Sequence, residues 1–377
     1  MAGFYVHIPF CKKACNYCDF HFVASLKYKN ELINAIISEI EERKTEWQHS
    51  TFDTIYFGGG TPTVLRVEEI NRISDSIFKN YRIEKKIEFT IEANPDDLSI
   101  SYLRQLKNET KINRLSIGIQ SFNDNILSFL NRRHNGKQAI DSITNANNIG
   151  FTNITIDLIY GIPGLSEKIW AETLNTFFRL NIPHLSAYQL MLEPKTIFYI
   201  KKKRGEFSEV DEQVSLAHYE ELIKKCNYNS YKHYEISNFC RQDFQSRHNS
   251  SYWKNIPYIG VGPSAHSYNG MIRRWNISNN SKYIEFIEDK SAGYFEIEEL
   301  SSRDKYNDYI LTSFRTIWGA NLVYIKNNFE MKFYSHFIKM LEKHKSNAHI
   351  LTEGEIVRLS EEGWLISDYL MSEFIYA

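Results

Sequence analysis

Short β-prone runs that alternate with helical segments are the feature of this 377-residue chain that most restricts its fold. Within Tyr28–Trp47, for example, Leu32, Ile36 and Ile40 recur on one helical face. Strands alternating with helices predict parallel strands joined by right-handed crossovers. Six such units favour a partial or complete α/β barrel over a small open sheet. The six runs are Phe4–Ile8, Thr54–Phe57, Glu88–Glu92, Arg114–Ile119, Asn153–Ile159 and His184–Leu190.

Polar and glycine-rich residues stand at the carboxyl ends of several of these runs. A cysteine-bearing loop follows the first run, Gly58–Pro62 follows the second, Glu92 ends the third, and Gln120 follows the fourth. In parallel α/β folds the βα loops converge at this edge of the sheet, and ligands bind there. The sequence therefore predicts that these segments face one cavity.

A different pattern begins near Lys201, so we expect residues 1–200 to form the barrel core. Residues 201–302 contain shorter strand-like pieces and irregular loops, which predict an extension that continues or covers the sheet. These pieces are Tyr231–Ile236, Tyr258–Val261 and Met271–Trp275.

The C-terminal part, residues 303–377, is mainly helical until a predicted turn and strand at Gly363–Ile366. Helices followed by a short hairpin suggest a small winged-helix-like domain. A docking lid is favoured over a nucleic-acid role, because this part lacks a dense basic face.

Three cysteines, Cys11, Cys15 and Cys18, lie directly after the first run. A [4Fe–4S] cluster held by only three thiolates keeps one iron open for a substrate or cofactor. The two other cysteines, Cys226 and Cys240, stand alone far downstream, without the second pair typical of zinc sites. Five cysteines are also too few, and odd in number, for a disulfide framework. The spacing favours a cluster over a structural zinc site, whose fourth ligand would be His7, Asp19 or His21.

The charge balance argues against nucleic acid as the main partner. Lysine and arginine together number 45 and aspartate and glutamate 46, so the chain has no overall excess of positive charge. No apolar run approaches the roughly 18 residues of a membrane span. The apolar run at the N-terminus contains His7 and Pro9 and does not resemble a signal peptide. We therefore expect a cytoplasmic protein without a membrane span.

The ordered motifs of the chain resemble the radical S-adenosylmethionine (radical SAM) superfamily. They are YVHIPFCKKACNYCDF, FGGGTP, IEANP, GIQSF and IDLIYGIP. More closely, the chain is similar to the branch of oxygen-independent coproporphyrinogen III oxidases and related heme chaperones. The resemblance implies a partial (β/α)6 barrel with a [4Fe–4S] cluster on the three cysteines. It also implies S-adenosylmethionine on the open iron, and an electron donor that lets the cluster generate a 5′-deoxyadenosyl radical.

The resemblance also implies which residues contact S-adenosylmethionine. Glu92 would be one of them, and a carboxylate at the end of an apolar strand rarely serves packing. Gly59 and Gly60 would also contact it, because the absence of a Cβ would let their backbone approach the methionine moiety. The remaining matches to this site are Tyr5, Tyr17 and Thr61.

Other residues match ligand-lining positions of the oxidases. Gln120, Arg132 and Asp157 correspond to positions that contact a second S-adenosylmethionine there. Met191 and His266 correspond to further ligand-lining positions. From the residues alone, Arg132 could equally be a helix-surface charge, and Met191 could equally be core.

Two features distinguish the branches. The oxidases carry a further cysteine two residues after the third, where this chain has Phe20. The segment HNSSYW matches the HNxxYW motif of the chaperones, whose histidine is associated with heme binding. The resemblance thus implies heme contacts at His248, Tyr252 and Trp253, and neutral imidazole is a common ligand of heme iron.

The resemblance therefore implies a radical-SAM-type heme chaperone. It would bind a [4Fe–4S] cluster, S-adenosylmethionine and heme, and would pass heme to an acceptor such as a respiratory-chain protein. The competing hypotheses are an oxygen-independent coproporphyrinogen III oxidase, which makes protoporphyrinogen IX, and a zinc-stabilised structural protein.

Overall fold

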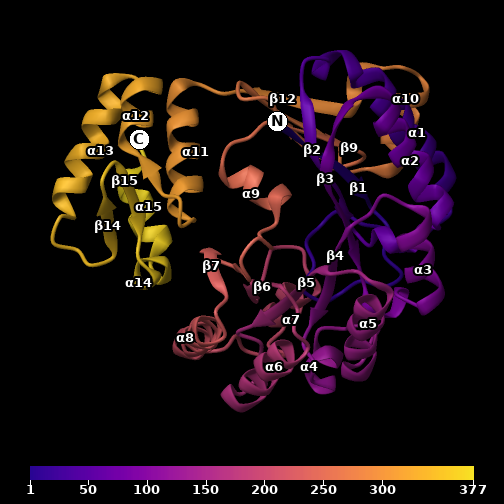
Figure 1. Cartoon of the computed structure of the whole chain (residues 1–377), viewed down its shortest axis with the longest axis horizontal. Coiled ribbons are helices and arrows are strands. Elements are labelled where there is room, and N and C mark those ends of the chain that lie inside the picture. The colour runs from indigo at the N-terminus through magenta and orange to yellow at the C-terminus, as the bar shows by residue number, and fades with distance from the viewer.

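The computed structural model describes residues 1–377 and contains one twelve-stranded sheet and one three-stranded sheet. Figure 1 shows that the small sheet and its helices lie beside the large one. Six parallel strands at the centre of the large sheet follow one another in chain order, and the sheet stays open at both ends. They are β1 (Ala2–Ile8), β2 (Thr51–Gly59), β3 (Arg82–Ala93), β4 (Arg114–Gln120), β5 (Asn153–Tyr160) and β6 (His184–Gln189).

The predicted α/β class and the parallel barrel core are confirmed, and each of the six predicted strands overlaps an observed one. The helices between the strands bury one apolar face against them, as Leu32, Ile36 and Ile40 of α1 do. Side chains such as Ser99 and Asn135 cap helix N-termini by accepting from backbone N–H groups. The helices are α1 (Lys29–Glu42), α2 (Val67–Asn80), α3 (Ile100–Glu109), α4 (Asp124–Phe129), α5 (Gly136–Ile149) and α6 (Glu167–Arg179).

The predicted extension continues the sheet at both edges. At one edge β9 (Tyr258–Val261) pairs in parallel with β1, and β10 (His266–Tyr268), β11 (Ile272–Asn276) and β12 (Phe295–Glu299) follow in antiparallel pairs. At the other edge β8 (Asn238–Cys240) and β7 (Lys232–Glu235) extend β6. The helices of this part are α7 (Ile197–Lys203), α8 (Glu212–Tyr228), α9 (Arg247–Trp253) and α10 (Asn280–Glu288).

A buried carboxylate ties the β9 edge to the barrel. Glu39 of α1 is fully buried and accepts from Arg43, from the side chain of Asn276, from the backbone of Gly262 and from the hydroxyl of Tyr283. Because each carboxylate oxygen has several donors, the burial of this charge is compensated. The network holds β9 and β11 against the first helix of the barrel.

The C-terminal part has its own hydrophobic cluster, which runs from Tyr306 to Phe374. It packs around the small sheet of β13 (Ala320–Asn321), β15 (Ile356–Leu359) and β14 (Ile350–Glu353). None of the helices in the molecule is both long enough and apolar enough to cross a bilayer. The C-terminal helices are α11 (Ser302–Phe314), α12 (Leu322–Asn328), α13 (Met331–Lys343), α14 (Glu361–Leu365) and α15 (Ser367–Phe374).

The strand predicted at Gly363–Ile366 is wrong, because Glu361–Leu365 forms α14. The hydroxyl of Ser360 accepts from the backbone N–H of Gly363 at 3.0 Å and caps this helix. The hairpin of this part lies earlier, between β14 and β15, where Gly354 turns the chain with a positive φ of 60°.

Candidate functional site

A cavity of about 500 Å³ opens at the carboxyl ends of the parallel strands, a size typical of small-molecule sites. It extends from the loop after β1 to the loop after β6. The sequence signals are tens of residues apart, and parallel strand order brings them to this one edge. The predicted site residues that line it are Cys11, Cys15, Cys18, Tyr17, Gly59, Gly60, Thr61, Glu92, Gln120, Arg132, Asp157 and Met191.

The three cysteines are half-buried free thiols on the β1 loop and all face this cavity. The sulfur of Cys11 lies 3.4 Å from the hydroxyl of Thr61, and Arg132 donates to the sulfur of Cys15 at 3.3 Å. Burial raises the pKa of Cys18 to about 12, so an iron must displace the proton for this thiol to become a ligand. Three soft sulfur donors beside a cationic side chain fit the chemistry of an anionic iron–sulfur cluster.

Two of the residues considered as a fourth zinc ligand are engaged elsewhere. The ring nitrogens of His7 lie 3.1 Å from the Tyr5 hydroxyl and 2.9 Å from the carbonyl of His21. The His21 ring hydrogen-bonds Asn280 at 2.7 Å. Neither histidine lines the cavity, and only Asp19 among the three candidates does. A zinc site completed by His7 or His21 is therefore not supported.

The Gly-rich segment at the end of β2 packs against the end of β1 and the loop that carries the cysteines. A Cβ on Gly60 would lie 2.6 Å from the carbonyl oxygen of Phe10, and one on Gly59 would lie 2.6 Å from the ring of His7. Gly59 also has a positive φ of 106°. A Cβ on either glycine would therefore collide with β1 or with the loop that follows it, while both glycines line the cavity, so their contact with a ligand stays a prediction.

Glu92, at the end of β3, is held by two donors from the neighbouring strand. The Tyr56 hydroxyl donates to one oxygen at 2.8 Å and the Gly59 N–H donates to the other at 3.1 Å. Burial, together with the nearby charge of Asp157, raises the pKa of Glu92 to about 7. Burial likewise raises the pKa of Asp157 on β5 to about 6, although Ser186 and Arg114 oppose the shift. Two perturbed carboxyl groups in one cavity are typical of a functional site.

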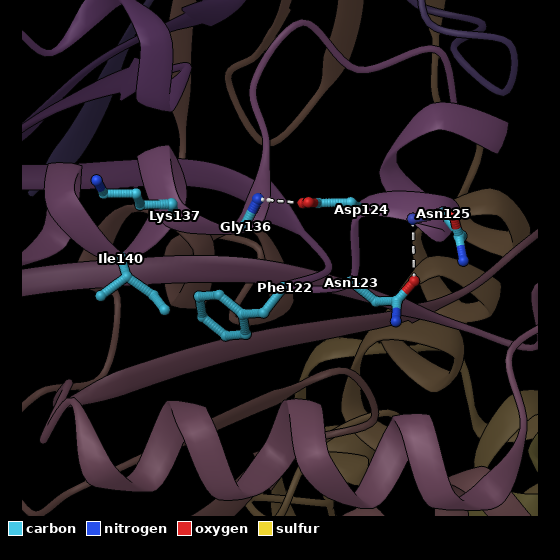
Figure 2. A pocket seen from close by; sticks show the side chains of 7 residues that line it. All are labelled: Phe122, Asn123, Asp124, Asn125, Gly136, Lys137 and Ile140. Carbon is cyan, nitrogen blue, oxygen red and sulfur yellow. Dashed lines mark hydrogen bonds between the residues drawn. The ribbon is translucent and has the colours of Figure 1, made fainter.

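The segment between β4 and α5 carries Arg132 into the cavity. Asp124 accepts from the backbone N–H of Gly136 at 2.7 Å and fastens the start of α5 to α4, as Figure 2 shows. A Cβ on Gly136 would lie 2.2 Å from the carbonyl oxygen of Phe122, so only glycine fits here. Arg132 donates to Asn94 and to the carbonyl of Gly118, beside the cysteine contact given above. It is therefore a cavity residue and not a helix-surface charge.

Five predicted site residues lie outside the cavity lining. Tyr5 belongs to β1, and its hydroxyl lies 3.1 Å from Nδ1 of His7. His266 is exposed on β10, and its ring stacks on Trp275 at 6.2 Å. The others, His248, Tyr252 and Trp253, belong to α9.

His248 is buried, and both of its ring nitrogens are engaged. Nδ1 lies 2.8 Å from the Thr54 hydroxyl and Nε2 lies 2.8 Å from the Tyr252 hydroxyl. Burial lowers the pKa of the ring to about 3, so it is neutral. Trp253 lies under the guanidinium of Arg315, at 5.4 Å. In this arrangement neither nitrogen of His248 is free to bind an iron, and the predicted heme ligation would require both hydrogen bonds to break.

The cavity also contains residues that the sequence reasoning missed. Asn249, the second residue of the HNxxYW segment, lines the cavity, whereas the histidine before it does not. Tyr56 and Asn94 line it and hold Glu92 and Arg132. Tyr56 lies within the second predicted strand, and Asn94 closely follows the third. These positions could have indicated both residues, because residues at the carboxyl ends of parallel strands face this edge of the sheet.

Comparison with known proteins places the chain in a family. The profile of the Radical SAM superfamily matches residues 5–177. A protein of Bacillus subtilis (strain 168) named heme chaperone HemW is 32% identical, over 100% of this chain and 99% of that protein. The chain belongs to the HemW family of radical SAM proteins. Another member, heme chaperone HemW of Lactococcus lactis subsp. lactis (strain IL1403), is 31% identical over 98% of this chain and 96% of that protein.

A solved structure supports the fold of this HemW-family chain. Coproporphyrinogen III oxidase (HemN) from Escherichia coli, described as a radical SAM enzyme, superposes with a TM-score of 0.86 at 23% identity. The match covers 99% of this chain and 90% of that one. The predicted family resemblance and the radical SAM barrel are therefore confirmed.

Proposed function

We propose that this HemW-family chain is a cytoplasmic heme chaperone. It binds a [4Fe–4S] cluster through Cys11, Cys15 and Cys18, holds S-adenosylmethionine in the cavity, and passes heme to an acceptor such as a respiratory-chain protein. The observation that carries the proposal is the likeness, over practically the full length, to proteins named heme chaperone HemW. An electron donor completes the set of partners.

The arrangement of polar groups supports S-adenosylmethionine in the cavity. Thr61 and Arg132 lie beside the cysteine sulfurs, and Glu92 offers a carboxylate to the cationic amino or sulfonium group of the ligand. When bound, a reduced cluster supplies the electron that cleaves the sulfonium. Arg132 stays fixed by Asn94 and Gly118, so it can orient an anionic group without further ordering.

The mouth of the cavity supports contact with a flat apolar ligand such as heme. Phe20 and Met191 both line the cavity, and each is 66% exposed. Large exposed apolar side chains mark binding surfaces, and an aromatic ring offers a face on which a porphyrin can stack. Lys13 also lines the cavity and offers a cation to a propionate group. We propose this mouth as the heme site.

Anaerobic reconstitution followed by heme titration and transfer tests the proposal. The reconstituted protein should bind heme in a saturable manner and should load an apo-acceptor faster than free heme does. Phe20→Ala should weaken heme binding about tenfold, since it removes an aromatic contact at the mouth. Tyr228→Ala serves as the control, because Tyr228 is an exposed aromatic residue away from the cavity. Absence of heme binding by the reconstituted wild-type protein would overturn the proposal.

Coproporphyrinogen III oxidation is the second candidate, because Gln120, Arg132 and Asp157 share the cavity and match oxidase positions. Phe20, where the oxidases have a further cysteine, argues against it. We expect the reconstituted protein with S-adenosylmethionine and a reductant to form no protoporphyrinogen IX from coproporphyrinogen III. Multiple turnovers of product, detected by chromatography, would favour the oxidase instead.

The pKa of Glu92 makes S-adenosylmethionine affinity depend on pH. With this pKa at about 7, the carboxyl group is ionised above neutral pH and protonated below it. Only the ionised form attracts a cationic ligand, so the affinity should fall about tenfold from about pH 8 to about pH 6. Isothermal titration across this range measures the effect. Glu92→Gln should bind more weakly at high pH and remove most of the pH dependence, whereas an unchanged profile would assign it to another group.

A further inference from the structure

Helix α9, which carries the HNxxYW segment, lies between the parallel strands and α11 (Figure 1). Its N-terminus is attached to β3 by Glu88, whose two carboxylate oxygens accept from the backbone N–H groups of Arg247 and His248 at 3.0 and 2.9 Å. A carboxylate at this position satisfies two helix N–H groups that would otherwise lack partners. The side chain of the next residue, Asn249, then reaches the cavity. The first turn of the helix therefore contributes Asn249 to the lining of the cavity.

The ring of His248 is fixed in one orientation. Its two hydrogen bonds, at 2.8 Å each to Thr54 and Tyr252, use both nitrogens, so one accepts and the other donates. Its face stacks on the ring of Tyr56, with centroids 5.0 Å apart and planes 23° apart. A buried, neutral imidazole with a hydrogen bond at each nitrogen is a rigid support for the Tyr56 ring that it contacts.

Tyr56 connects this support to the cavity. Its hydroxyl donates to Glu92, whose other oxygen accepts from the N–H of Gly59 in the Gly-rich segment. His248, Tyr56, Glu92 and Gly59 thus form a continuous series of contacts from α9 to the wall of the cavity. Removing the imidazole would leave a void beside the Tyr56 ring and would free it to move.

We propose that His248 is a positioning residue for S-adenosylmethionine binding, which acts by holding Tyr56 and, through it, the carboxylate of Glu92. This inference rests on the proposed S-adenosylmethionine site but not on heme binding. It assigns the histidine of the HNxxYW segment a role that needs no contact with iron, in agreement with its two occupied nitrogens.

A double-mutant cycle tests this role. In the cluster-reconstituted protein, His248→Ala should raise the Kd for S-adenosylmethionine about five- to tenfold. If His248 acts through Glu92, the same change in a Glu92→Gln background should alter the Kd less than about twofold. Iron content and thermal unfolding of every variant are measured alongside, so that lost affinity is not mistaken for lost cluster or fold. A His248→Ala effect that persists at full size in the Glu92→Gln background would overturn the proposal.

Milder variants keep the test valid if His248→Ala does not fold. Tyr252→Phe and Thr54→Val each remove one hydrogen bond to the ring, and each should raise the Kd about two- to threefold while the stack on Tyr56 remains. Heme titration of the same proteins should leave the absorption spectrum of bound heme unchanged. Unaltered S-adenosylmethionine affinity together with a changed heme spectrum would instead identify His248 as an iron ligand. A wild-type protein that binds no S-adenosylmethionine would contradict the proposed site itself, before any variant is compared.

Discussion

Cys15→Ala is expected to abolish cluster assembly. Cys15 is the central cysteine of the loop, lines the cavity, and receives the hydrogen bond from Arg132. With only two of the three thiolates left, the cluster loses its ligand set, and S-adenosylmethionine loses the open iron that it would chelate. Iron and sulfide content after anaerobic reconstitution should fall close to background. Affinity for S-adenosylmethionine should fall by more than about tenfold.

Cys226→Ala provides the matched control for this loss. Cys226 is fully buried in α8 and belongs to the hydrophobic core, away from the cavity. Its replacement should cost about 1 kcal/mol of stability and leave the iron content unchanged. Equal loss of iron in both variants would mean that the cysteines of the β1 loop are not the cluster ligands. Zinc without iron in the reconstituted wild type would favour the structural zinc hypothesis.

Gly60→Ala is expected to produce the second large effect. The added Cβ would lie 2.6 Å from the carbonyl oxygen and 2.8 Å from the backbone nitrogen of Phe10, and backbone atoms cannot rotate away as a side chain can. The β1 loop must therefore shift, and with it the cysteines that follow Phe10. We expect a loss of about 3 kcal/mol in stability and a marked loss of iron retention. Thermal unfolding and iron analysis measure the two effects.

Gly164→Ala separates this steric effect from the general cost of replacing a glycine. A Cβ on Gly164 would meet no atom of another segment within 4 Å, so the positive φ of 84° accounts for the whole penalty. That strain should cost about 1 kcal/mol without affecting iron content. If Gly60→Ala retained iron as well as Gly164→Ala does, the close packing between the Gly-rich segment and the cysteine loop would not matter for the cluster.

Local patterns predicted much of the fold. Apolar periodicity predicted α1 and the six parallel strands, because each segment must bury an apolar face and therefore carries its own periodic pattern. The C-terminal hairpin was expected but placed too late in the chain, because β14 and β15 are four residues each and join through a single exposed turn at Gly354. At Gly363 the glycine suggested a turn, whereas the cap from Ser360 starts a helix there.

Some residues of the candidate site could likewise be predicted from local sequence, and others could not. The spacing of Cys11, Cys15 and Cys18 is a property of one loop, so sequence alone could predict the cluster. Glu92 and Asp157 stand at strand ends, and parallel topology then predicts that they share a cavity. Arg132 could not be assigned from its neighbours, because its partners Asn94 and Cys15 come from other loops.

The sequence by itself determined the α/β alternation, the three-cysteine loop and the family, because each depends on residue types and spacing along the chain. The tertiary structure alone decided what surrounds each side chain. His248 carries the chemistry of a metal ligand, yet Thr54, 194 positions away in the sequence, occupies one of its nitrogens. Gly60 was expected to let a ligand approach, and the structure adds a second reason for glycine there, because a Cβ would collide with the backbone of Phe10. Burial and partners across such separations arise only when the strands assemble, and they determine which of a residue's possible roles remain open.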